Sequence, residues 1–133
     1  MFAVFNRGNF PIVEVTMNGS PESDEEFDNF LNEWTKLYSE QNNFYFIFHT
    51  ENVSNPPIKY SVKMANYIKN LRKKDYQYLQ KSVILINNNK VKWLLDFIFT
   101  IQPPVADVYI IDTNKTSFTI DNIDNITGDG VIY

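Results

Sequence analysis

The chain has 133 residues, a formal net charge of −4, 44% hydrophobic residues and 16% aromatic residues. This length and composition indicate one globular domain with a substantial core and exclude a disordered chain. The absence of cysteine excludes a disulfide framework, a thiolate metal site and a cysteine nucleophile, and the acidic balance argues against a dedicated nucleic-acid binder.

The chain begins with two short strand patterns, FAVFN and PIVEVTM, and the intervening RGNF predicts a hairpin turn. The opening residues lack a basic segment followed by a long apolar run, so we expect no secretory signal and a cytoplasmic protein.

The segment SPESDEEFDNFLNEWTKLYSEQ predicts an amphipathic helix. Ser23 followed by Glu26 forms a capping box, and the acidic residues around them favour the positive end of the helix dipole. Large apolar residues recur at spacings of three and four, as expected for one buried face: Phe27, Phe30, Leu31, Trp34, Leu37 and Tyr38.

Two further strands and a second helix follow in alternation. NFYFIFHT and KSVILIN are apolar at nearly every position, which is typical of strands covered on both faces. Between them, ENVSNPP predicts a loop, and the two prolines suit the entrance of a helix from about Ile58 to Arg72.

The segment NNNKVKWLLDFIFTIQPP predicts a third helix with an unusually wide apolar face. Its apolar part, Val91 to Ile101, is far shorter than the ~20 residues that a membrane span needs. We expect Leu94, Leu95 and Ile98 to be buried, and Trp93 and Phe97 to lie under flanking helices. The alternative is that Trp93 and Phe97 form a partly exposed patch that a partner or a ligand covers.

The strand pattern ADVYIID follows, and the polar tail after it predicts a short edge strand near Phe118 to Ile120 with a loose end. Alternating strands and helices predict an α/β domain with a mainly parallel sheet, an N-terminal antiparallel hairpin and helices as right-handed crossovers. We expect a single domain over residues 1–133, with its core at about 2–112 and an edge strand and tail at 113–133.

This order resembles the STAS domain, the SpoIIAA-like fold of anti-anti-sigma factors. The segment YQYLQKSVILINNNKVKWLLDFIFTIQPPVADVYIID is also similar to the structurally related CRAL-TRIO lipid-transfer domains. There a Tyr-Pro and Leu element precedes an apolar strand, an Asn, and a Trp-containing helix that ends at a Pro. The resemblance covers roughly Phe10 to Asp112, and its matching residues are Tyr76, Tyr78, Leu79, Val83 to Ile86, Asn87, Trp93, Leu94, Ile98 and Pro103.

The STAS resemblance implies a non-enzymatic regulatory or protein-interaction module, phosphorylated in some members on a serine after the second main strand. Here the loop HTENVSNPPIKYS places Ser54 and Ser61 near that point, without the preceding Asp or the following Gly. We therefore predict Ser54, Asn55 and Ser61 as a phosphoacceptor or partner loop. The alternative is that Ser54 only shapes a turn.

Other functions stay open as alternatives. The CRAL-TRIO resemblance implies a carrier of a lipid or other apolar ligand, although this chain lacks that family's additional helices. An enzyme using His49 is a second alternative, but a lone histidine without a Cys or Ser motif is more often structural. We expect no catalytic residue, metal or cofactor, because no glycine-rich loop follows a strand and the acidic run ESDEE fans around its helix.

Charge is unevenly distributed between the first two helices. The first is acidic, whereas the second carries a basic surface of Lys63, Lys69, Arg72, Lys73 and Lys74. The two helices are either neighbours that attract one another, or opposite poles that steer a charged protein partner or a head-to-tail homo-oligomer.

Overall fold

A six-stranded sheet forms the centre of the computed structural model, which describes residues 1–125 and 131–132. Spatial order follows chain order: β1 (Ala3–Asn9), β2 (Ile12–Gly19), β3 (Phe44–Val53), β4 (Leu79–Ile86), β5 (Asp107–Asp112) and β6 (Val131–Ile132). Strands β2 to β5 are parallel, whereas β1 pairs antiparallel with β2 and β6 with β5. The predicted mainly parallel α/β sheet with an N-terminal antiparallel hairpin is confirmed.

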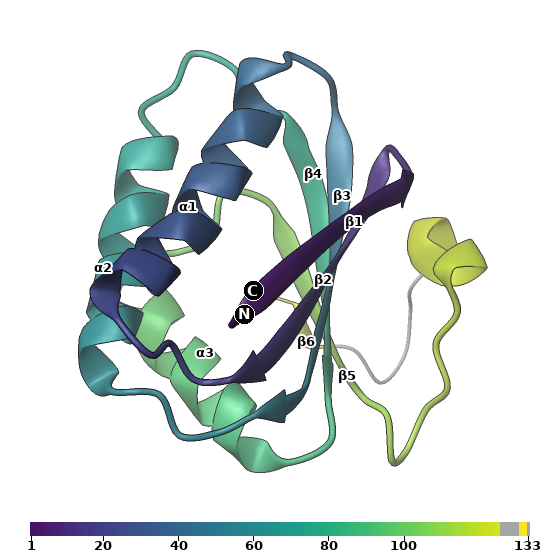
Figure 1. Ribbon diagram of the computed structural model, residues 1–133. Coiled ribbons are helices and arrows are strands. Elements are labelled where there is room, and N and C mark those ends of the chain that lie inside the picture. Colours follow the sequence, from purple (N-terminus) through teal and green to yellow (C-terminus); the bar gives the residue numbers. More distant parts are fainter. Residues whose placement is uncertain (126–130, 133) are drawn as a thin grey trace.

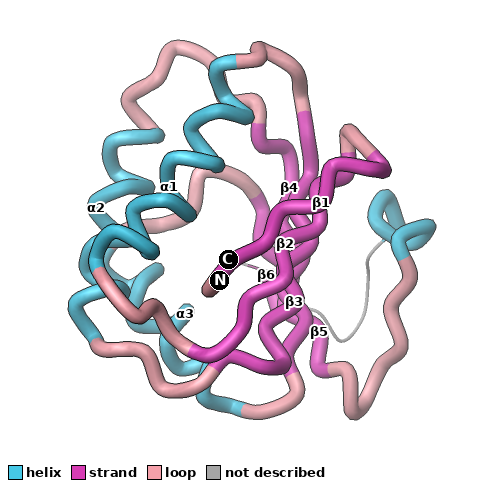
Figure 2. Tube along the Cα trace, in the orientation of Figure 1, coloured by secondary structure: helices cyan, strands magenta, loops and turns pink. Residues whose placement is uncertain are grey.

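The three α-helices of the described part all cover one face of this sheet (Figures 1 and 2). They are α1 (Asp24–Ser39), α2 (Ile58–Leu71) and α3 (Asn89–Ile101). Each parallel strand is added at the same edge, so right-handed crossovers place every helix on the same side. Open α/β sheets bind ligands where the strand order reverses. From β2 to β5 this order never reverses, so that crevice is absent from the parallel part of the sheet.

Helix α1 begins at the predicted cap. The Ser23 backbone is extended, and its hydroxyl accepts a hydrogen bond from the Glu26 N–H at 3.2 Å. The buried side of α1 is almost entirely aromatic and packs on the rings of β3. The indole of Trp34, for example, meets the ring of Phe46 edge-on with centroids 5.0 Å apart.

Strand β3 supplies side chains to both faces of the sheet, as its continuous apolar run predicts. Phe44, Phe46 and Phe48 point towards the helices, and Ile47 points to the opposite face. On that opposite face Ile47 joins a second apolar cluster with Val83, Leu85 and Ile111.

The polar tail covers this second face, in a form that differs from the prediction. Phe118 and Ile120 pack on the second cluster, and Ile120 begins the short 3₁₀ helix η1 (Ile120–Asn125), which lies opposite the α-helices in Figure 1. The edge strand predicted near Phe118 to Ile120 is therefore wrong, and the edge strand is β6. The apolar cluster lies in the middle of the sheet, where an edge strand could not cover it. The segment after β5 therefore crosses this face of the sheet and places Phe118 and Ile120 on the cluster. The predicted loose end at 126–130 and 133 lies outside the described residues.

Candidate functional site: a groove and a pocket beside helix α3

Helix α3 is less buried than its apolar sequence predicts. Only Val91 and Ile98 are fully buried, while Leu94 and Leu95 are half-buried. Helix α3 connects β4 to β5, so α2 flanks it on one side and no α-helix of the described part flanks it on the other. Burial is therefore confirmed for Ile98 and is only partial for Leu94 and Leu95.

One side of α3 carries exposed aromatic and aliphatic side chains at every fourth residue. Trp93 is 60% exposed and Ile101 is 50% exposed, and Phe97 between them is half-buried. The rings of Trp93 and Phe97 stack with centroids 6.1 Å apart and planes inclined by 18°. The expectation that Trp93 lies under flanking helices is wrong, because its neighbours across this surface are Asn55 and Pro56 of the loop between β3 and α2, which leave most of the ring exposed.

The structure brings Trp93 together with the loop that follows β3. Asn55 and Pro56 from this loop form a surface groove with four residues of α3: Asn89, Lys90, Trp93 and Leu94. We call this set the α3 groove. Its two sides follow β3 and β4, which are neighbouring parallel strands, so their carboxyl ends meet at one end of the sheet (Figure 1). Asn55 of the predicted partner loop and Trp93 of the predicted partner patch thus line one groove, whereas Ser61 is buried.

The two serines predicted as phosphoacceptors differ in accessibility. Ser54 is exposed, and its N–H donates to the Gly19 carbonyl at 2.9 Å. Ser61 is only 5% exposed, on the core side of α2, so a kinase cannot reach its hydroxyl in the folded chain. Phosphorylation of Ser54 stays a prediction.

Beneath the α3 groove lies a pocket of about 160 Å³ between the helices and the sheet. All three α-helices contribute to its walls, which are apolar except for Thr50, Ser61 and Ser82. Pro56 and Leu94 line both the pocket and the α3 groove, so the two are adjoining spaces. The sequence predicted an apolar ligand as an alternative, but it did not locate this pocket. The sequence does contain one signal for it. Thr50, Ser61 and Ser82 are small hydroxyl residues at positions that face a core of large apolar side chains.

The three hydroxyls that line this pocket differ in their hydrogen bonding. Thr50 donates to the Leu85 carbonyl at 2.7 Å. Ser61 and Ser82 are each 5% exposed, and neither hydroxyl forms a hydrogen bond with any residue that the structure describes. The indole N–H of Trp34, which also lines the pocket, is buried without a hydrogen-bond partner among the described residues. The residues lining the pocket therefore carry two serine hydroxyls and one indole N–H that are not used in hydrogen bonds within the described part of the chain.

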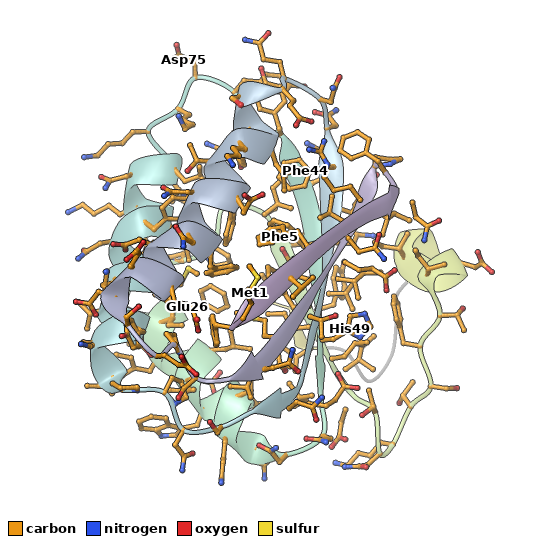
Figure 3. All side chains as sticks on the ribbon, viewed as in Figure 1. Met1, Phe5, Glu26, Phe44, His49 and Asp75 are labelled. Atoms are coloured by element: carbon orange, nitrogen blue, oxygen red, sulfur yellow. The ribbon has the colours of Figure 1, made fainter. Side chains whose placement is uncertain are left out.

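His49 lies on the opposite face of the sheet, away from the pocket and the α3 groove (Figure 3). Its Nε2 is 2.9 Å from the Glu14 carboxylate, and its Nδ1 is 4.0 Å from the Glu51 carboxylate. Within the described part of the chain, no group of three or more His, Cys, Asp or Glu side chains is arranged to hold a metal ion. The local geometry is that of a histidine hydrogen-bonded to a neighbouring strand.

The acidic and basic helices are neighbours linked by ion pairs. Lys59 Nζ lies 3.0 Å from Asp24, and Lys63 Nζ lies 2.8 Å from Asp28. The hydrogen bond from Lys59 lowers the pKa of Asp24, and the hydrogen bond to Asp28 raises the pKa of Lys63. Lys63 is thus paired within the domain.

The remaining residues of the predicted basic surface lie at the end of α2 and just beyond it. Arg72 donates to the Pro104 carbonyl at 2.8 Å. Lys69, Lys73 and Lys74 are exposed and form no ion pair with the residues that the structure describes. The basic surface that is free for contacts is therefore smaller than predicted and is confined to the carboxyl end of α2.

Comparison with protein-family models, with curated proteins and with solved structures finds no match to this chain. In the described residues, no helix is long and apolar enough to cross a membrane.

Proposed function

We propose that this domain is a non-enzymatic interaction module that binds a protein partner through the α3 groove and the adjoining Trp93 and Phe97 rings. The observation that carries this proposal is the exposed indole of Trp93, which is stacked on Phe97 and shares a groove with Asn55. Tryptophan is among the residues most enriched at the energetic centres of protein interfaces.

The energetics favour a partner contact at this position. Covering a large apolar side chain contributes about 1.5–3 kcal/mol, so the Trp93 ring alone supports a small interface. Tryptophan supplies a large contact area with only two side-chain torsions, so ordering it on binding costs little conformational entropy. Lys90 at the rim of the groove suits a partner that carries an acidic residue beside its apolar anchor.

Regulation by phosphorylation belongs to the same proposal, as the STAS resemblance implies. Ser54 is exposed and immediately precedes Asn55 in the wall of the α3 groove. A phosphate there would add about −1.5 to −2 charges at pH 7 beside the partner surface. An acidic partner would then bind more weakly to the phosphorylated domain.

The test is a comparison of proteins crosslinked to purified full chains that differ only at exposed aromatic residues. Trp93→Ala and Phe97→Ala should each lose a specific partner while the chain stays folded, and Trp93→Ala should cost less than about 1 kcal/mol of stability. Tyr76→Ala is the matched control, because Tyr76 is also exposed but lies before β4. A partner that crosslinks equally to all of these chains would contradict the proposal, and sedimentation analysis would reveal a second copy as the partner.

A second candidate function, the carrying of an apolar ligand, is favoured by the pocket beneath the groove. Pockets that hold drug-sized ligands usually measure about 300–1,000 Å³. The pocket here is about 160 Å³, so a whole long-chain lipid does not fit inside it.

A further inference from the structure

We propose that the pocket beneath the α3 groove is a binding site for a compact, neutral aromatic molecule that carries one hydroxyl group, of the size of phenol or cresol. This inference goes beyond the proposed partner contact, because it rests on the interior of the domain rather than on its exposed α3 side.

The size of the pocket sets the upper limit for the ligand. An apolar cavity of about 150 Å³ engineered into another protein binds benzene, and the pocket here measures about 160 Å³. One six-membered ring with one or two small substituents therefore fills it without moving the helices.

The walls determine the chemical class of the ligand. None of the side chains that line the pocket is charged, so a carboxylate or an ammonium group would lose its hydration without gaining a partner. Aromatic rings from α1, α2 and β3 line it, including Phe27, Tyr60 and Phe48. Such rings pack favourably on another aromatic ring in offset or edge-on geometry.

Two unpartnered hydroxyls specify the polar group of the ligand. Ser61 from α2 and Ser82 from β4 are each 5% exposed and line the pocket, and their side-chain hydroxyls form no hydrogen bond within the described part of the chain. A hydroxyl can both donate and accept a hydrogen bond, so it suits a serine in either role. A site with unpaired polar groups also discriminates against an analogue that lacks the matching hydroxyl.

The α3 groove supplies the entrance. Pro56 and Leu94 line both the groove and the pocket, and neither side chain is fully buried. A small ligand therefore passes between the loop after β3 and the first turns of α3.

The experiment is a titration of the isotope-labelled full chain, followed by NMR, with phenol, benzene and benzoate as probes. Phenol should bind saturably and about fivefold more tightly than benzene, as expected for one hydrogen bond worth about 1 kcal/mol. Benzoate should not bind. The shifted amides should be those of pocket residues such as Ser82 and Ile84.

Variants show whether the serines recognise the hydroxyl. In a Ser61→Ala and Ser82→Ala double variant, phenol affinity should fall about fivefold, to the benzene level, while benzene affinity is unchanged. Ser82→Val, which fills part of the pocket, should weaken both ligands, and urea unfolding checks that the variant is folded. Absence of saturable binding, which is the result for a pocket holding only water, overturns the proposal. Equal affinity for phenol and benzene, or shifts confined to residues outside the pocket, also overturns it.

Discussion

The buried side chain of Tyr38 makes the stability of the fold depend on pH. Its side chain is buried between α1 and the sheet, and its hydroxyl donates to the Gln77 side-chain carbonyl at 2.8 Å. Burial raises the pKa of Tyr38 to about 12, compared with about 10 for a tyrosine in an unfolded chain. Because the folded state holds the proton more tightly, its contribution to stability is intact below pH 10 and is lost as pH rises towards 12.

Replacing Tyr38 with phenylalanine should remove this pH dependence. At pH 8 the Tyr38→Phe variant should be about 1 kcal/mol less stable than wild type, because the hydrogen bond to Gln77 is lost. Between pH 10 and 12, wild type should lose up to about 2 kcal/mol that the variant does not lose. Urea unfolding at pH 8, 10 and 11.5 measures both differences. A stability gap that stays constant across these pH values would contradict the assignment, and exposed Tyr76→Phe should behave as wild type.

At the level of elements, α3 has a buried side and an exposed side that can be separated by substitution. Ile98 is buried, so Ile98→Ala should lower the free energy of unfolding by about 2–4 kcal/mol. Trp93 is mostly exposed, so Trp93→Ala should cost less than about 1 kcal/mol although it removes a larger side chain. Chemical denaturation of the two variants tests the ranking. A reversed order would mean that Trp93 belongs to the core.

The start of α1 offers a second test at the level of elements. Ser23→Ala removes the hydroxyl that accepts from the Glu26 N–H and should destabilise the domain by about 1 kcal/mol. Ser23→Asp keeps an acceptor at the cap, so its free energy of unfolding should lie within a few tenths of a kcal/mol of the wild-type value. Thermal unfolding at neutral pH compares the two variants. Wild-type stability in Ser23→Ala would show that the cap bond contributes nothing.

The elements themselves were predictable because periodicity and capping are local properties of the chain. The helix beginning after Ser23, the strand NFYFIFHT and the break at Pro103 are each encoded within a few residues. The exposure of Trp93 was not predictable in this way. It depends on the loop between β3 and α2, which lies beside Trp93 without covering it, and a helical wheel gives the width of an apolar face without saying what covers it.

At the level of the whole molecule, the two faces of the sheet are covered by different kinds of structure. Three α-helices cover one face, and the segment after β5, including η1, covers an apolar cluster on the other (Figure 1). The polar composition of this segment predicted a loose end. The few apolar residues Phe118, Ile120 and Ile123 were sufficient to hold it, because the cluster beneath them would otherwise face water.

Ile123 tests whether the tail is an integral part of the fold. It is buried against the cluster that contains Val83 and Ile111, so Ile123→Ala should cost about 2–4 kcal/mol. Ile58→Ala is the matched control, because that side chain is half-exposed and should cost less than about 1 kcal/mol. Urea unfolding of both variants gives the comparison. Equal and small losses would show that the tail does not stabilise the second face.

The sequence predicted separate parts of the candidate site, but it did not predict that they lie next to one another. The loop around Asn55 and the rings of Trp93 and Phe97 were each identified from sequence, but the meeting of Asn55 and Trp93 in one groove depends on the pairing of β3 with β4. The pocket forms because side chains from all three α-helices and the sheet leave space between them. The sequence of any one segment cannot show that such space remains. Ser82 illustrates the difficulty, since a serine in an apolar strand does not reveal that its neighbours leave space beside it.

The sequential strand order also bears on how the domain is made. Every strand in the sheet pairs with the strand that precedes it in the chain, so none must be inserted between two strands that are already paired. Domains generally fold as units, and contacts between segments close in sequence form quickly. As the chain leaves the ribosome, the β1–β2 hairpin can receive β3 as soon as α1 has closed over it, and β4 and β5 can follow in turn. Each strand can therefore add to the edge formed by the strand before it, and no pair of strands has to separate to admit another.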